Sequence, residues 1–115
     1  MDLVKPEIKS YDCVTYDPID SYEFKDNRNV DFWMNFTIGL EDSEAGDDFE
    51  VRVATYNNIE LTESIEHTIL LEQYSFDLVL SQIDDILSKC QGEDWVEISG
   101  KLAKYMHWEF QDYQP

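Results

Sequence analysis

Basic residues are scarce in this chain, which has 8 Lys and Arg against 26 Asp and Glu. Its 115 residues therefore carry a formal net charge of −18. Phosphates are bound by cationic side chains, so we expect no direct binding to nucleic acid and none to an anionic membrane surface. A field of this sign attracts a basic protein and speeds its association, but a high net charge also keeps small proteins soluble. Composition alone leaves both interpretations open.

Residues that build common catalytic and metal sites are also few. The 4 glycines are too scattered for a glycine-rich phosphate loop. His67 and His107 are the only histidines, and neither lies in a zinc-binding HExxH motif. Cys13 and Cys90 form no CxxC pair, so we interpret them as free thiols in the core. We therefore expect no cofactor, no metal site and no catalytic site, with a small enzyme as the minority hypothesis.

Long apolar runs are missing as well. No run of 18 apolar residues could span a membrane, and the first ten residues lack the basic start and apolar core of a secretory signal. We therefore expect a cytoplasmic protein. Its 14% aromatic content is too high for a disordered acidic chain, and its length suits one domain over residues 1–115.

Period-2 alternation indicates strands in the first half of the chain. The even positions of residues 30–40 are all apolar: Val30, Phe32, Met34, Phe36, Ile38 and Leu40. Such alternation is typical of a strand with one buried face. Residues 49–53 alternate in the same way, so residues 41–48 are interpreted as the loop of an antiparallel hairpin. Residues 3–14 and 68–74 are weaker strand predictions.

The apolar period lengthens to three and four residues after residue 75, which indicates two helices. The first is predicted over residues 76–91, with Ser75 as its cap and Gly92 in a left-handed conformation beyond its end. The second follows Asp94, which forms a capping-box pattern with Glu97. Its apolar face is Trp95, Ile98, Leu102, Tyr105 and Met106. Strands grouped before helices predict an α+β fold, a mainly antiparallel sheet covered on one face by the two C-terminal helices.

Six of the ten residues at positions 41–50 are acidic and none is basic. The acidic residues are Glu41, Asp42, Glu44, Asp47, Asp48 and Glu50. Because neighbouring like charges raise the energy of the folded state, such a segment is either well solvated or bound to a cationic partner. Two interpretations therefore stay open: a solvated hairpin tip, or part of a docking surface for a basic protein.

The C-terminal segment, residues 104–113, interleaves four aromatic rings with two acidic residues. Aromatic side chains that a fold leaves exposed are common interface hot spots. Alternatively, Trp108, Phe110 and Tyr113 hold the tail against the core, which is the interpretation we favour. His107 is expected to contact the last carbonyl groups of the preceding helix.

Four short motifs resemble those of a known protein family. They are IGL at 38–40, DFEVRV at 48–53, DWVEI at 94–98 and the closing YxxWEFxDY at 105–113. On these motifs the chain resembles the bacterial immunity proteins of polymorphic toxin and contact-dependent inhibition systems, most closely immunity protein family eight. The resemblance implies a small acidic cytoplasmic protein, encoded beside a toxin, that neutralises this toxin by binding it. Toxins paired with such families are often nucleases but include other types, so the resemblance leaves the toxin's activity open.

The charge, the resemblance and the lack of catalytic motifs together predict binding to a basic toxin domain. The candidate toxin-binding residues are Glu41, Asp42, Glu44, Asp47, Asp48, Trp108, Glu109 and Asp112. A DNA mimic that blocks a DNA-binding protein is the alternative. Mimicry requires ordered rows of acids, because B-DNA carries about one charge per 1.7 Å of its axis. In this sequence the acidic residues fall in predicted loops as often as along predicted helices, which disfavours the DNA-mimic alternative.

Overall fold

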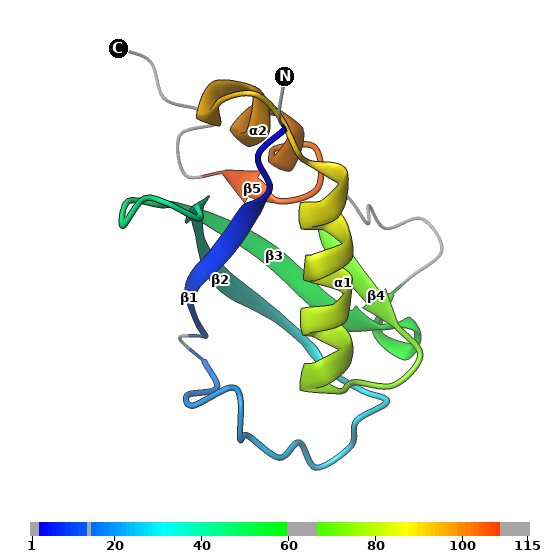
Figure 1. Cartoon of the computed structure of the whole chain (residues 1–115). Helices are drawn as coiled ribbons and strands as arrows, with labels where there is room; N and C mark the ends of the chain where they lie inside the picture. The colour runs from blue at the N-terminus through cyan, green and yellow to red at the C-terminus, as the bar shows by residue number, and fades with distance from the viewer. Residues whose placement is uncertain (1–2, 14, 60–66, 109–115) are drawn as a thin grey trace.

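A computed structural model describes residues 3–13, 15–59 and 67–108 of the chain. This part contains a sheet, two α-helices and a short 3₁₀-helix (Figure 1). In chain order the elements are β1 (Pro6–Asp12), β2 (Asp31–Leu40), β3 (Asp47–Thr55), the 3₁₀-helix (Tyr56–Asn58), β4 (Thr68–Leu71), α1 (Phe76–Lys89), α2 (Trp95–Leu102) and β5 (His107–Trp108). The predicted α+β class is confirmed.

The strands form one sheet in the order β1, β2, β3, β4. β1 and β2 pair antiparallel, as do β2 and β3, so the predicted hairpin is confirmed. β4 runs parallel to β3 beside residues 52–55. β5 pairs antiparallel with Phe49 and Glu50, nearer the start of β3. The sheet is thus mainly antiparallel, and β4 and β5 follow one another along the same side of β3.

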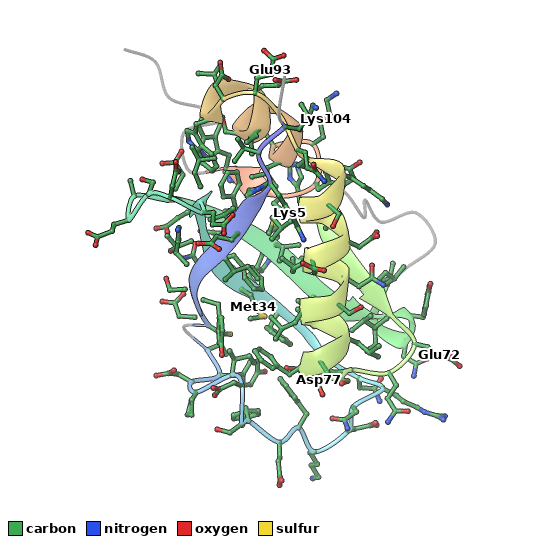
Figure 2. The ribbon with its side chains drawn as sticks, viewed as in Figure 1. Lys5, Met34, Glu72, Asp77, Glu93 and Lys104 are labelled. Atoms are coloured by element: carbon green, nitrogen blue, oxygen red, sulfur yellow. The ribbon has the colours of Figure 1, made fainter. Side chains whose placement is uncertain are left out.

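One face of the sheet packs against α1 (Figure 1). The positions of β2 that alternation predicted to be buried form this face together with residues of β3 and α1. The shared core includes Phe32, Met34, Phe36, Ile38, Phe49, Val51, Val53, Val79, Ile83 and Leu87. Met34, labelled in Figure 2, is 1% exposed. Burial of each such side chain contributes roughly 1.5–3 kcal/mol, so the packing of α1 on this face is a large apolar contribution to stability.

α1 begins at Phe76, as predicted, and ends at Lys89, two residues before the predicted end. Ser75 occupies the N-cap position, but its side chain makes no capping hydrogen bond. The left-handed conformation predicted for Gly92 is wrong, because no described glycine has a positive φ. Gly92 instead exchanges two backbone hydrogen bonds with Val4, at 2.8 and 3.1 Å. These bonds tie the end of α1 to the start of the described chain.

α2 begins at Trp95 behind an Asp94 N-cap, which confirms the capping prediction. The backbone N–H of Glu97 donates to Oδ1 of Asp94 at 2.9 Å. The Glu97 carboxylate accepts from the backbone N–H of Glu93, one residue before the cap, at 2.8 Å. Tyr105 was predicted on the apolar face of this helix, but it is 39% exposed because α2 ends three residues earlier.

Both cysteines are free and buried, as predicted. The Cys13 thiol donates to the backbone carbonyl oxygen of Trp33 at 3.4 Å. Burial raises the pKa of the Cys90 thiol. Because the thiolate is the reactive form, a raised pKa keeps Cys90 unreactive at neutral pH.

Candidate functional site

The acidic segment lies at the hairpin between β2 and β3, at one end of the sheet (Figure 1). The hairpin loop consists of residues 41–46, which we call the hairpin tip. The predicted loop extended two residues further, to Asp48, and is wrong there, because β3 already begins at Asp47. These two aspartates pair with Ile38 and Thr37 of β2, so they belong to the sheet.

The hairpin tip presents three exposed carboxylates, those of Glu41, Asp42 and Glu44. Within the described residues, none of the three has an ion-pair or side-chain hydrogen-bond partner. A Cβ atom on Gly39 would overlap the carbonyl oxygen of Ala45. Glycine therefore allows the close backbone approach that closes this loop and places the three carboxylates at its end.

Asp47 and Asp48 are adjacent but point to opposite faces of the sheet, since successive side chains of a strand alternate. Asp47 faces the helices, and its Oδ2 atom accepts two indole N–H groups, from Trp95 at 2.9 Å and from Trp108 at 3.1 Å. Asp48 faces the other way and accepts from the hydroxyl of Thr37 at 2.7 Å. Both aspartates are half-buried and already hold internal partners, unlike the carboxylates of the hairpin tip.

Trp108 lies in β5, and its ring packs on the core. The indole stacks on Phe49, with ring centroids 6.3 Å apart and ring planes at 12°. Trp95 meets the same phenylalanine edge to face, also at 6.3 Å. Trp108 therefore holds β5 against the core, the favoured of the two interpretations of the C-terminal segment. The remaining residues of that interpretation and of the candidate site, Glu109, Phe110, Asp112 and Tyr113, lie outside the described residues.

A hollow of about 250 Å³ opens beside the hairpin tip. It is lined by Gly39, Leu40, Ser43, Ala45, Gly46, Asp47 and Trp95. The charged group in this lining, Asp47, already accepts two indole hydrogen bonds. The lining therefore lacks the several convergent polar groups that orient a substrate in a catalytic pocket.

The two histidines lie close together, edge to face, with ring centroids 6.0 Å apart. His67 Nε2 is 3.2 Å from the carbonyl oxygen of Ala103, the C-cap residue of α2. The contact that was expected of His107 is thus made by His67, 36 positions before that carbonyl. His107 itself lies in β5 opposite Glu50. Over residues 3–13, 15–59 and 67–108, no three His, Cys, Asp or Glu side chains gather in the manner of a metal site.

The chain also matches a known family over nearly its whole length. The sequence model of the family described as Immunity protein 8 matches residues 6–113. This chain belongs to the Immunity protein 8 family. Immunity proteins neutralise toxins, and such families are generally non-catalytic. No curated protein and no solved structure matches the chain.

In this Immunity protein 8 member, neither helix of the described part is long and apolar enough to cross a membrane. Two of its tryptophans have positions that the sequence pattern did not single out. Trp95 was predicted only as part of an apolar helix face, yet its indole N–H holds Asp47. Trp33 occupies an outward position of β2, where a polar residue is usual, and is 48% exposed. The tryptophan side chain itself could have indicated both positions. A buried indole has an N–H donor that needs a hydrogen-bond partner, and an exposed indole leaves a large apolar surface in water.

Proposed function

We propose that this Immunity protein 8 member neutralises a cognate toxin domain in the cytoplasm by binding it, without catalytic turnover. The bound surface of the toxin is basic and contacts the hairpin tip. The observation that carries the proposal is the placement of Glu41, Asp42 and Glu44 at the end of the hairpin, exposed and without a cationic partner in the described chain. Like charges held together in this way are stabilised by a cationic partner.

The net charge of −18 supports fast capture of such a toxin. Complementary charge raises association rates from about 10⁵–10⁶ to as much as 10⁸–10⁹ M⁻¹s⁻¹ at low salt. Local contacts then set the dissociation rate. If the toxin is a nuclease, its phosphate-binding groups are cationic, and carboxylates placed on them exclude the nucleic acid. Docking at a different basic surface excludes the substrate sterically.

The test uses the toxin domain encoded beside the gene for this protein, in a catalytically inactive form. We expect a stable complex whose association rate falls steeply with added salt, because ions screen charges that are separated by more than about 8–10 Å. No complex at low salt would overturn the proposal, and an association rate that is indifferent to salt would overturn the steering mechanism. Binding to several unrelated DNA-binding proteins would instead support the DNA-mimic alternative.

The role of the hairpin tip is tested by a triple variant with a matched control. The tip variant carries Glu41→Gln, Asp42→Asn and Glu44→Gln. The control carries Glu23→Gln, Glu72→Gln and Asp77→Asn, three exposed acids elsewhere, two of which are labelled in Figure 2 far from the hairpin. Both variants lose three negative charges, so the net charge of the protein changes equally in the two. An affinity about tenfold lower for the tip variant than for the control would identify a local contact, and equal affinities would reduce the tip to a solvated loop.

A further inference from the structure

Both described helices pack on one face of the sheet, and the opposite face carries the outward positions of the strands. We call this opposite surface the open face. Residues that pair directly across two strands point to the same side. One row across β1, β2, β3 and β5 therefore consists of Asp12, Asn35, Glu50 and His107. In the next row, Trp33 of β2 pairs with Arg52 of β3.

Trp33 is the conspicuous apolar side chain of the open face. Trp33 is 48% exposed, whereas Met34, the next residue in β2, is 1% exposed on the helix side. Tryptophan is on average a well-buried residue, and a half-exposed indole leaves a large apolar area in water. The packing of the described core gains little from an indole at this position. A bound partner would gain much more from it.

A hollow of about 150 Å³ lies beside Trp33. It is lined by Asp12, Thr15, Trp33, Met34, Asn35 and Glu50. Asp12 and Glu50 reach it from β1 and β3, the two strands that flank Trp33. A hollow of this size holds several waters or one long side chain. A side chain bound in this hollow would therefore contact the Trp33 ring and two carboxylates.

The charges around this hollow are unbalanced. Arg52 is bound by Asp31, with its Nε and Nη2 atoms 2.8 and 2.6 Å from the two carboxylate oxygens. This bidentate pair neutralises the guanidinium. Among the described residues, neither Asp12 nor Glu50 forms an ion pair. The hollow beside Trp33 is therefore negative and complementary to a cation.

We propose that the open face docks the toxin and that the hollow beside Trp33 receives an arginine side chain of its basic surface. This inference rests on the proposed function, because the toxin supplies the arginine. A guanidinium stacks on an indole by cation–π attraction and forms charge-assisted hydrogen bonds to carboxylates such as those of Asp12 and Glu50. Lysine fits less well because its ammonium is a compact point charge without a planar face.

The hairpin tip and the open face form one continuous surface along β2 and β3. Trp33 lies seven residues before the end of β2 at Leu40, which corresponds to about 23 Å along a strand. A standard interface buries about 800 Å² on each partner, a patch roughly 30 Å across. One toxin domain can therefore contact both features. The carboxylates of the tip attract it, and the indole slows its dissociation.

The inference is tested with the full chain and the inactive toxin domain encoded beside its gene, at one fixed salt concentration. Trp33→Ala is expected to weaken binding by about tenfold or more, mainly through faster dissociation. Trp33→Lys adds a cation to the negative hollow and is expected to weaken binding by about a hundredfold or more. Tyr56→Ala is the matched control, because Tyr56 is 59% exposed and does not line the hollow. It should change the affinity by less than about twofold.

The outcomes separate this inference from the function on which it rests. Thermal unfolding first verifies that each variant is folded. Substitutions at exposed positions such as Trp33 and Tyr56 usually change stability little. If the wild type binds the toxin and both Trp33→Ala and Trp33→Lys bind it with the same affinity as the wild type, the open-face inference is overturned. The proposed function is then unaffected. Equal losses in Trp33→Ala and Tyr56→Ala would also overturn the open-face inference. A wild type that does not bind the toxin would overturn both proposals.

Discussion

Asp47 and Trp108 are joined by a hydrogen bond of 3.1 Å, although 61 positions separate them in the sequence. The same carboxylate oxygen accepts from Trp95, so one aspartate connects β3, α2 and β5. This contact divides the acidic segment by role. Asp47 joins three elements of the fold, whereas the carboxylates of the hairpin tip are exposed.

Replacement of Asp47 by alanine is expected to destabilise the protein. Both indoles lose their acceptor, and a hydrogen bond to a charged group contributes about 1.5–3 kcal/mol to the free energy of unfolding. Urea denaturation measures this loss. Glu44→Ala removes the same charge from the exposed tip and should change the free energy by less than about 0.5 kcal/mol. Equal changes in the two variants would contradict the structural role of Asp47.

The two helix caps are expected to differ in strength. Asp94→Ala removes the acceptor of the Glu97 backbone N–H and should lower the free energy of unfolding by about 1 kcal/mol. Ser75→Ala should cost less, because the Ser75 side chain makes no capping hydrogen bond. Denaturation followed by far-ultraviolet circular dichroism compares them. A larger loss for Ser75→Ala would show that the observed cap geometry does not determine the stability of these helices.

Alanine is expected to have opposite effects at two glycines. At Gly39 the added Cβ would overlap the carbonyl oxygen of Ala45, so Gly39→Ala should destabilise the hairpin by about 1–3 kcal/mol. At Gly100, in α2, the added Cβ meets nothing within 4 Å. Because alanine favours a helix, Gly100→Ala should stabilise the protein by up to about 1 kcal/mol. Thermal unfolding reports both signs, and a stabilised Gly39→Ala variant would refute the predicted clash.

Tyr74 makes stability depend on pH in the alkaline range. It is 6% exposed, and its hydroxyl has no hydrogen-bond partner among the described residues. Burial, followed by the nearby Cys13, raises the pKa of Tyr74 from 10.0 to about 12. The unfolded chain therefore releases this proton at a lower pH than the folded chain. The contribution to stability is complete below pH 10 and is lost as the pH rises toward about 12.

Tyr74→Phe is expected to remove this dependence. Urea denaturation across the same pH interval should show a shallower loss of stability in the variant. At neutral pH the variant should be more stable by about 1 kcal/mol, because a buried hydroxyl without a partner is removed. Tyr56→Phe, at an exposed tyrosine, is the control and should show neither change. The same alkaline slope in wild type and Tyr74→Phe would rule out this origin of the pH dependence.

The periodicity of single segments predicted much of the fold. Alternation placed Phe36 and its neighbours in the core, and the longer period placed α1 from Phe76. The cap of α2 followed from Asp94 and Glu97, because both partners lie within one turn. The errors fell at element ends, where Gly92 bonds to Val4 at the other end of the chain.

The sequence by itself determined the β2–β3 hairpin, the presence of the two helices, the net charge and the acidic content of the hairpin, since each depends on residue types within one segment. Only the tertiary structure decided that Asp47 is held by Trp95 and Trp108, that Asp48 bonds to Thr37, and that Trp33 is exposed beside two carboxylates. The physical reason is that a carboxylate is free to bind a partner only if no donor atom of the protein lies within hydrogen-bond distance, about 3 Å. Strand register and helix packing bring those atoms together from distant parts of the chain.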